Sequence, residues 1–307
     1  MTGTVDSPDL SEWIYLKVYV GQAVDKVDGL LLETVPRILA LEPFERWFFL
    51  RYLDEKGVHL RLRFRVPAGS AARLAGPIHA LCERQLGRLA HLPPTSYRPM
   101  VFPTAGSRDA DAQRNVPATV GIVADTYQPE LEKFGGTSGM PIAEEVFESS
   151  SRIALAILAD EVQGRFSRKT IAPCLMQVVL DSIAPGEDAE CFWRNYSLYW
   201  LGGQTTAAED WRRRFFEKGS RLSDEQIPIM WTADLPSRAT ALANEWREQL
   251  RRACNAYDQI ENLGQVTADI LAFNFAHLMN NRLGLITLEE AYLAALLEQR
   301  ARGEQAA

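Results

Sequence analysis

The sequence predicts an α+β fold, with a mainly antiparallel sheet in the N-terminal half covered by a helical C-terminal half. Residues 47–66 alternate apolar and polar side chains on both sides of a glycine-containing turn, which is the pattern of a β-hairpin. From residue 169 onward, apolar side chains recur with a period of about 3.6, which is typical of amphipathic helices. We therefore expect a single domain over residues 1–307, with a sheet-rich part at 1–166 and a mainly helical part at 167–307.

The predicted elements follow in order along the chain. Residues 13–20 are rich in aromatic and β-branched side chains and end at a glycine, so they predict a strand. The hairpin turns at residues 54–57, and the prolines that follow residue 92 end the next helix. Before a polar loop expected at 104–118, we expect a helix or turn at 28–41 and a helix at 70–92. After that loop, we expect a strand at 120–123 and a helix at 140–158. The later helices are expected at 172–183, 189–201, 207–218, 239–257 and 266–281.

A row of basic side chains is predicted on one face of the hairpin. Successive side chains of a strand point to opposite faces, so Leu60, Leu62 and Phe64 share the core face. The other face carries His59, Arg61, Arg63 and Arg65. Arg51 on the preceding strand joins this row if the register permits. The alternatives are a solvated strand face, which contributes little to the core, and a site for an anionic or electron-rich group that relieves the repulsion between arginines.

The composition indicates a globular protein whose main task is not to grip nucleic acid. Lys and Arg number 33 against 40 Asp and Glu, which gives a net charge of -7 and a pI near 5.3. The four cysteines lack the spacing of a zinc site or a disulfide scaffold. No signal segment and no run of about 18 apolar residues occurs. We expect a cytoplasmic protein without a metal, a nucleic-acid partner or a membrane contact.

A second candidate site lies on the predicted helix that contains FNFAHLMNNRLGL, residues 273–285. Helical spacing places His277 on a polar face together with asparagines, Asn281 among them. Histidine titrates near neutral pH and can act there as an acid or a base, although a lone helical histidine is more often structural. The aromatic stretch 192–200 is also at helical spacing, which favours a core position over a stacking platform.

Three segments in series resemble one protein family. They are HLRLRF at 59–64, YQPELEKFGG at 127–136 followed by AEEVFESSS at 143–151, and HLMNNRLG at 277–284. Together they resemble the C-terminal, elimination-type domain of class I lantibiotic dehydratases, a domain that also occurs alone in thiopeptide gene clusters. The resemblance covers most of the chain in the right order. It therefore implies one elimination-like domain over the whole sequence.

The resemblance implies an enzyme that modifies a ribosomally made precursor peptide with a leader. One branch eliminates glutamate from O-glutamylated Ser or Thr. In the other, a free-standing relative joins two dehydroalanines in a formal [4+2] cycloaddition that gives a pyridine after loss of water and leader. Carried over by motif, His277 is the histidine near the abstracted proton, and Arg61 and Arg63 are the arginines that hold a carboxylate. Tyr127 would share in catalysis by hydrogen bonding.

Two positions depart from the dehydratase pattern. Where that pattern has arginines after the tyrosine, this chain has Pro129 and Lys133, and lysine lacks the bidentate fork of arginine. The departure favours cycloaddition over glutamate elimination, and a non-catalytic, leader-binding scaffold is a third alternative. The expected substrate contacts are Arg51, His59, Lys133, Asn281 and Arg282. The implied partners are the precursor peptide and the other enzymes of the pathway, and no cofactor is implied.

Overall fold

The computed structural model describes residues 11–21, 26–90, 119–224 and 235–305. The described residues form two compact units, the first made of residues 11–21, 26–90 and 119–129, the second of residues 130–224 and 235–305. Each unit is described by itself, and the single domain expected over residues 1–307 stays a prediction. The loop expected at 104–118 and the prolines after residue 92 lie outside the described residues.

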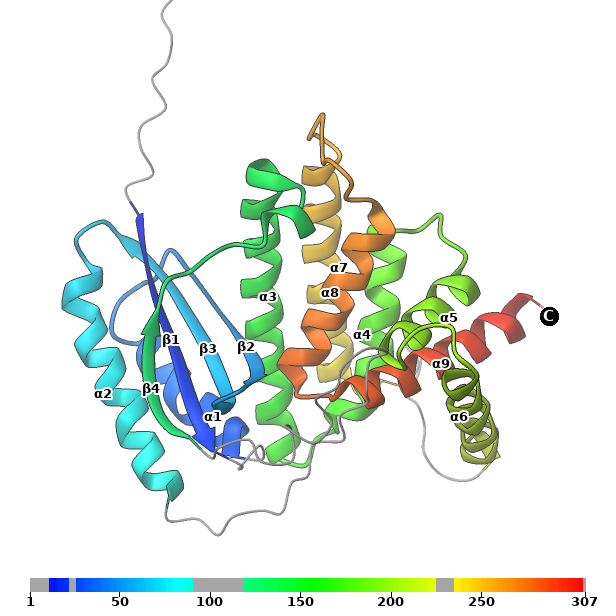
Figure 1. Ribbon diagram of the computed structural model, residues 1–307, viewed down its shortest axis with the longest axis horizontal. Coiled ribbons are helices and arrows are strands. Elements are labelled where there is room, and N and C mark those ends of the chain that lie inside the picture. The colour runs from blue at the N-terminus through cyan, green and yellow to red at the C-terminus, as the bar shows by residue number, and fades with distance from the viewer. Residues whose placement is uncertain (1–10, 22–25, 91–118, 225–234, 306–307) are drawn as a thin grey trace, which may run out of the picture. The chain divides into compact units, whose positions relative to one another are not determined.

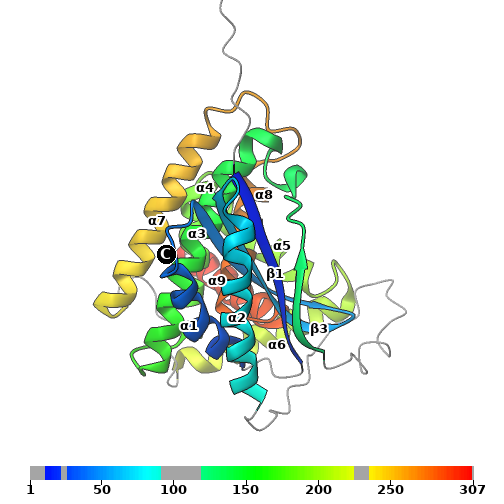
Figure 2. The same cartoon turned by 90° about the vertical axis from the view of Figure 1, so that its left-hand side faces the viewer.

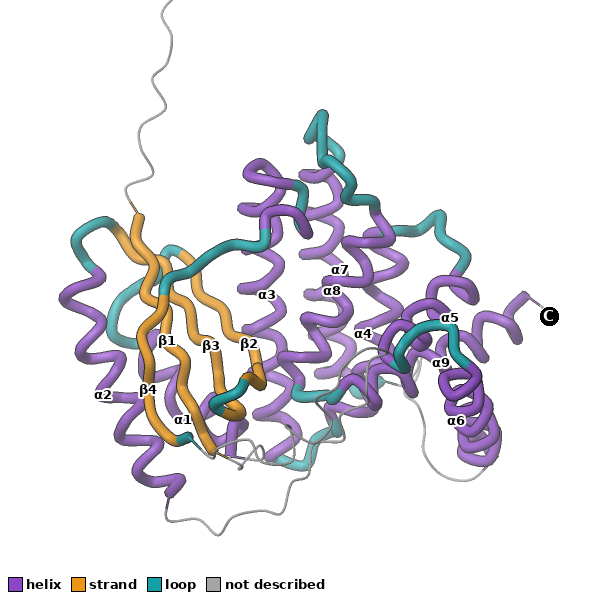
Figure 3. The backbone as a smooth tube through the Cα atoms, in the orientation of Figure 1, coloured by secondary structure: helices purple, strands orange, loops and turns teal. Residues whose placement is uncertain are grey.

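The first unit is built on a four-stranded antiparallel sheet, as the sequence predicts (Figure 3). Its strands are β1 (Ser11–Gly21), β2 (Arg46–Asp54), β3 (Gly57–Pro67) and β4 (Val120–Asp125), in the order β2-β3-β1-β4. Strands β2 and β3 form the predicted hairpin, because Asp54 pairs with Gly57 across a two-residue turn. Gly57 has a φ of 124°, a conformation that favours glycine. In the strand order β2-β3-β1-β4, the two central strands β3 and β1 each pair with a strand on both sides.

Two helices of the same unit cover one face of this sheet. They are α1 (Lys26–Leu39) and α2 (Ala71–Ala90). Helix α2 packs on β1 and β4, α1 packs beside α2, and Figure 2 shows both helices in front of the strands. The predicted core face of β3 is confirmed, because Leu60, Leu62 and Phe64 are each at most 1% exposed. The opposite face of the sheet carries the basic row.

From residue 136 onward, the described part of the second unit is mainly helical (Figure 1). After the short 3-10 helix η2 (Leu131–Lys133), its helices are α3 (Gly136–Val162), α4 (Arg168–Ile183), α5 (Ala189–Trp200), α6 (Thr206–Asp224), α7 (Ser237–Tyr257), α8 (Ala268–Leu283) and α9 (Thr287–Gln305). Helices α3 and α4 both pack on α7 and α8, while α5 and α6 pack on α9. The helices predicted after residue 140 are confirmed within a few residues. Helix α9 was not predicted as a separate element.

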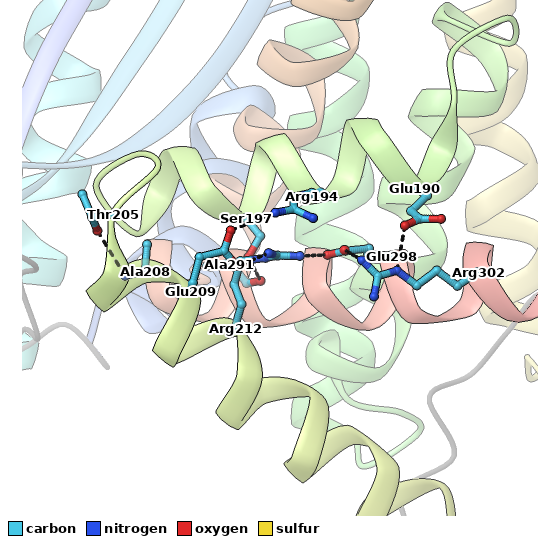
Figure 4. A network of polar contacts seen from close by, with 10 residues as sticks. All are labelled: Glu190, Arg194, Ser197, Thr205, Ala208, Glu209, Arg212, Ala291, Glu298 and Arg302. Atoms are coloured by element: carbon cyan, nitrogen blue, oxygen red, sulfur yellow. Dashed lines mark hydrogen bonds and ion pairs between the residues drawn. The ribbon is translucent and has the colours of Figure 1, made fainter.

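A buried ion-pair network joins α5, α6 and α9 (Figure 4). Glu298 of α9 is 0% exposed and accepts hydrogen bonds from Arg212 of α6 and Arg302 of α9. Arg212 also donates to Glu209 at 2.6 Å, and Glu209 accepts from Arg194 of α5 at 2.9 Å. Removing a carboxylate from water is costly unless the charge is paired. The two arginines therefore make the burial of Glu298 tolerable.

Candidate functional site

The basic row of β3 lies on the face of the sheet opposite to α1 and α2. In an antiparallel sheet, residues directly opposite each other on neighbouring strands share a face. The register places Tyr15 of β1 and Phe48 of β2 on either side of Arg63, and Lys17 of β1 beside Arg61. Aromatic rings thus flank Arg63, whereas Lys17 places a further cation beside Arg61. Of the two alternatives, this arrangement supports the electron-rich environment rather than a solvated face.

Arg63 is enclosed by aromatic rings and is only 8% exposed. Its guanidinium carbon lies 4.6 Å from the ring centre of Tyr15, 4.9 Å from that of Tyr127 and 5.5 Å from that of Phe48. Among the described residues, no carboxylate pairs with Arg63, and its Nε has no hydrogen-bond partner. Burial lowers the pKa of Arg63, and the neighbouring tyrosines oppose that shift. The expectation that this face contributes little to the core is therefore wrong for Arg63.

Arg61 and His59 form a second group on the same face. The guanidinium carbon of Arg61 lies 3.3 Å from the ring centre of Tyr52, and its Nε donates to Nε2 of His59 at 3.5 Å. His59 is 0% exposed, with Nδ1 3.2 Å from the carbonyl oxygen of Gly57. A neutral imidazole satisfies both contacts, because Nδ1 donates and Nε2 accepts. Burial is the main cause that lowers the pKa of His59 below its ordinary value of 6.5.

The buried His59 predicts a pH-dependent stability. The unfolded chain binds a proton below about pH 6.5, whereas folded His59 stays neutral to a lower pH. The stabilisation is thus fully present above that pH and is lost as the pH falls. We expect His59→Asn to reduce this slope in urea unfolding of the full chain between about pH 8 and pH 5. His79→Asn, at an exposed position of α2, is the control, and equal slopes in both variants would contradict the prediction.

Arg51 does not join the basic row, which corrects a prediction. The register places Arg51 opposite Leu60, on the face that α1 and α2 cover. Its Nη2 donates to Oδ1 of Asp28 in α1 at 2.6 Å. A shift of one residue in register moves a side chain to the other face, and strand alternation alone does not fix the register between β2 and β3. Arg51 therefore fastens α1 to the sheet, and we no longer count it as a substrate contact.

Tyr127 and Lys133 come from one sequence motif but belong to different units. The ring of Tyr127 lies 4.6 Å from that of Trp13 and completes the aromatic enclosure of Arg63. Lys133 ends η2 at the surface of the second unit and pairs with Glu130 at 3.1 Å. An exposed pair of this kind is weak, so it holds the ammonium group only loosely. The proposed role of Lys133 in substrate binding stays a prediction.

The second unit carries His277, whose imidazole is held by a buried carboxylate. Nδ1 of His277 lies 3.1 and 3.2 Å from the two carboxylate oxygens of Glu290, whose side chain is 1% exposed. The hydroxyl of Tyr196 donates to the same carboxylate at 2.5 Å, and the side-chain amide of Asn280 donates to it at 3.3 Å. None of the described residues hydrogen-bonds Nε2, and the His277 side chain is 29% exposed. An imidazole oriented through one nitrogen and open at the other suits an acid or a base.

A sharp turn between α8 and α9 brings His277 and Glu290 together. Gly284 ends α8 with a φ of 82°, a left-handed conformation that favours glycine. Its N–H donates to the carbonyl oxygen of Asn281, and the next N–H donates to that of Asn280, each at 3.0 Å. The chain therefore changes direction within three residues, which places Glu290 in the first turn of α9 beside His277 of α8.

A cluster of aromatic rings from α5 and α8 packs beside the imidazole of His277 through Trp200. The ring centre of Trp200 lies 4.5 Å from that of His277, and Phe273 stacks on Trp200 at 5.9 Å. Tyr199 packs edge-on against both Trp200 and Phe273, at 4.9 Å from each, and is 61% exposed. The predicted core position of this aromatic stretch is thus right for Tyr196 and wrong for Tyr199.

Comparison with known families accounts for nearly the whole chain. Residues 13–301 match the family described as lantibiotic biosynthesis dehydratase C-term. The chain belongs to this family. A search of curated proteins finds no match.

Three solved structures share the fold of this chain. The pyridine synthase TbtD from thiomuracin biosynthesis is 19% identical, with a TM-score of 0.65 over 95% of this chain and 98% of that one. The tRNA-dependent lantibiotic dehydratase MibB from Microbispora sp. 107891 is 18% identical, with a TM-score of 0.63 over 100% of this chain. This chain spans only 29% of the length of MibB. TsrL is 18% identical, with a TM-score of 0.58 over 96% of this chain and 95% of that one.

Arg282 lies in the interior of the helical unit of this family member and is 0% exposed. Its Nε donates to the hydroxyl of Ser151 at 2.9 Å, and its Nη1 donates to the carbonyl oxygen of Leu278 at 3.0 Å, so it joins α8 to α3. A substrate cannot contact a side chain in this position, and we no longer count Arg282 as part of the candidate site. Asn281 is partly exposed, and its role as a substrate contact stays a prediction.

Two residues of the His277 group were not predicted from the sequence. Glu290 follows His277 by 13 residues across a helix end, and Tyr196 precedes Glu290 by 94 residues, so no spacing rule connects them. The segment TLEE at 287–290 offers one signal, because it fits a helix-capping pattern that would explain Glu290 as a cap. In the structure Glu289 accepts the backbone N–H at the start of α9, and Glu290 binds His277 instead.

Two negative findings apply to the part of the chain that the structure describes. There, no group of three His, Cys, Asp or Glu side chains is placed to hold a metal ion. Within the same residues, no helix has the length and apolar character needed to cross a membrane.

Proposed function

We propose that the chain modifies a ribosomally synthesised precursor peptide by formal [4+2] cycloaddition of two dehydroalanines, which forms the pyridine core of a thiopeptide and releases the leader. The observation that carries the proposal is His277, with Nδ1 held by Glu290 and a partly exposed side chain that packs against the ring of Trp200. The pyridine synthase from thiomuracin biosynthesis supports it, because this chain covers 98% of that enzyme. The precursor peptide and the other enzymes of the pathway would be the partners.

The proposed reaction needs proton transfers that an imidazole can perform. The amide that precedes the first dehydroalanine loses its N–H proton and gains a proton on oxygen, which produces an iminol and hence a 2-azadiene. Two C–C bonds then form between this diene and the second dehydroalanine. A C–O bond breaks to release water and a C–N bond breaks to release the leader as a carboxamide, and each departure takes one ring proton. His277 of the second unit would accept the amide proton at Nε2. The catalytic roles of Arg61, Arg63 and Tyr127, which belong to the first unit and could donate hydrogen bonds to peptide carbonyls, stay predictions.

Glutamate elimination from O-glutamylated Ser or Thr is the second candidate, and Arg63 favours it. A buried guanidinium with no carboxylate partner among the described residues is suited to hold the carboxylate of a glutamyl group. In this reaction a base removes the α-proton of the modified residue, and the ester oxygen leaves with glutamate. Lys133 opposes this candidate, because a lysine in the place of an arginine cannot bind a carboxylate through a bidentate fork.

Mass spectrometry of two synthetic peptides distinguishes these reactions. One peptide carries an O-glutamyl serine, and the other carries a leader and two dehydroalanines. We expect the purified chain to release water and leader from the second peptide and to leave the first unchanged. Loss of glutamic acid from the first peptide alone would overturn the cycloaddition in favour of elimination. Binding of either peptide without a change in mass would favour a non-catalytic scaffold that binds the leader.

A further inference from the structure

The carboxylate of Glu290 determines which nitrogen of His277 carries the proton. An ionised carboxylate can only accept hydrogen bonds, so the ring nitrogen that faces it must be protonated. Nδ1 is that nitrogen, at 3.1 and 3.2 Å from the two oxygens of Glu290. In neutral His277 the other nitrogen, Nε2, then has a free lone pair and can accept a proton.

The carboxylate of Glu290 accepts hydrogen bonds from two further neighbours. Burial of a carboxylate is tolerable only when hydrogen bonds compensate the lost water. Besides His277, the hydroxyl of Tyr196 donates to Glu290 at 2.5 Å and the amide of Asn280 donates at 3.3 Å. Burial and the nearby carboxylate raise the pKa of Tyr196 well above its ordinary value, so the hydroxyl keeps its proton and remains a donor.

Packing fixes the direction from which Tyr196 approaches. The Tyr196 side chain is 1% exposed, and its ring lies 4.5 Å from that of Phe273 and 5.7 Å from that of Trp193. The imidazole of His277 is restrained from another side by Trp200, whose ring centre is 4.5 Å away. The two helices that carry Tyr196 and His277 thus converge on the carboxylate of Glu290, which begins a third.

We propose that Glu290 and Tyr196 are positioning residues that keep the proton of neutral His277 on Nδ1 and so present Nε2 as the proton acceptor. The proposal deepens the proposed function and rests on it, because Nε2 accepts a proton from the substrate only if the chain catalyses that reaction. Glu290 binds and orients the imidazole, while Tyr196 acts one step further away by orienting the carboxylate. Neither residue needs to touch the substrate.

The tautomer of His277 can be read from the 15N chemical shifts of the imidazole nitrogens in the full chain. The sequence holds four histidines, and a His277→Gln variant identifies the signals of His277. At about pH 8, where ordinary histidines are neutral, we expect wild-type His277 to carry its proton on Nδ1. Glu290→Gln should shift a measurable fraction to the Nε2-protonated form, because a neutral amide can either accept or donate. Tyr196→Phe should produce a smaller shift in the same direction.

Matched controls separate positioning from folding. Glu289→Gln removes a neighbouring charge of α9, and Tyr199→Phe removes a hydroxyl one turn from Tyr196, and both should leave the tautomer unchanged. An unchanged His277 spectrum in folded Glu290→Gln and in folded Tyr196→Phe would overturn the proposal. This readout does not depend on turnover. A tautomer shift in a chain that transforms neither test peptide therefore refutes the proposed function and supports the positioning of His277.

Turnover provides the second readout. If the wild-type chain forms product, Glu290→Gln should lower kcat with little change in KM. The decrease should not exceed the factor of about 100 to 10,000 that a positioned proton-transfer group contributes. A rise in KM with kcat unchanged would overturn the assignment, because it would place Glu290 in substrate binding. Glu290→Asp, which keeps the charge on a shorter side chain, should recover part of kcat and part of the Nδ1-protonated form.

Discussion

Replacement of His277 by asparagine is expected to lower turnover of the dehydroalanine peptide by about 100- to 10,000-fold, the range that positioned general acids and bases contribute. Asparagine can still form a hydrogen bond with Glu290, but it cannot exchange a proton at neutral pH. The His277 side chain is 29% exposed, so the free energy of unfolding should change much less than the rate. Initial rates by mass spectrometry and urea unfolding measure both effects.

His79→Asn is the control for this variant. His79 is exposed on α2 in the first unit, and its replacement should leave turnover at the wild-type level. If His277→Asn also retains wild-type turnover, His277 is a structural residue and the proposed reaction uses another base.

The largest effect on stability is expected from Arg212→Met, which should lower the free energy of unfolding by about 3 to 5 kcal/mol. Arg212 is 2% exposed and donates to Glu298 and Glu209 in the network of Figure 4. Its removal leaves Glu298, which is 0% exposed, with Arg302 as its remaining cationic partner among the described residues. Loss of one partner from a buried ion pair is costly because the other charge stays buried.

Arg213→Met tests whether the loss in Arg212→Met comes from burial. Arg213 is the next residue of α6, its side chain is 66% exposed, and it pairs with Asp210 at 2.8 Å. Exposed pairs of this kind contribute up to about 1 kcal/mol, so Arg213→Met should have a correspondingly small effect. Urea unfolding of both variants gives the comparison, and equal losses would refute the importance of the buried network.

Local patterns were sufficient to predict the sheet and much of its basic face. The alternation in β3 correctly placed His59, Arg61 and Arg63 on one side, because the direction of a side chain along a strand depends only on its position. Alternation could not show that Arg63 is enclosed, since the rings around it come from three separate segments. It also could not place Arg51, because a side chain's face relative to the next strand depends on register.

In the helical unit, the sequence identified His277 but not the residues that orient it. Most of the helices have a visible apolar stripe, whereas α9 has buried apolar residues around much of its circumference and no single stripe to detect. Glu290 lies in that helix, and its contact with His277 depends on the turn at Gly284. Tyr196 was interpreted as core, which is correct for its ring, but its hydroxyl binds Glu290. A long-range contact of this kind leaves no periodic trace in the sequence.

The most direct test of the central claim is a side-by-side mass-spectrometric assay of the wild-type chain and His277→Asn on the peptide that carries a leader and two dehydroalanines. We expect the wild-type chain to release water and the leader and to leave a pyridine-containing product, and we expect His277→Asn to leave the peptide unchanged over the same period. An unchanged peptide with the wild-type chain, or equal conversion by both proteins, would contradict the account.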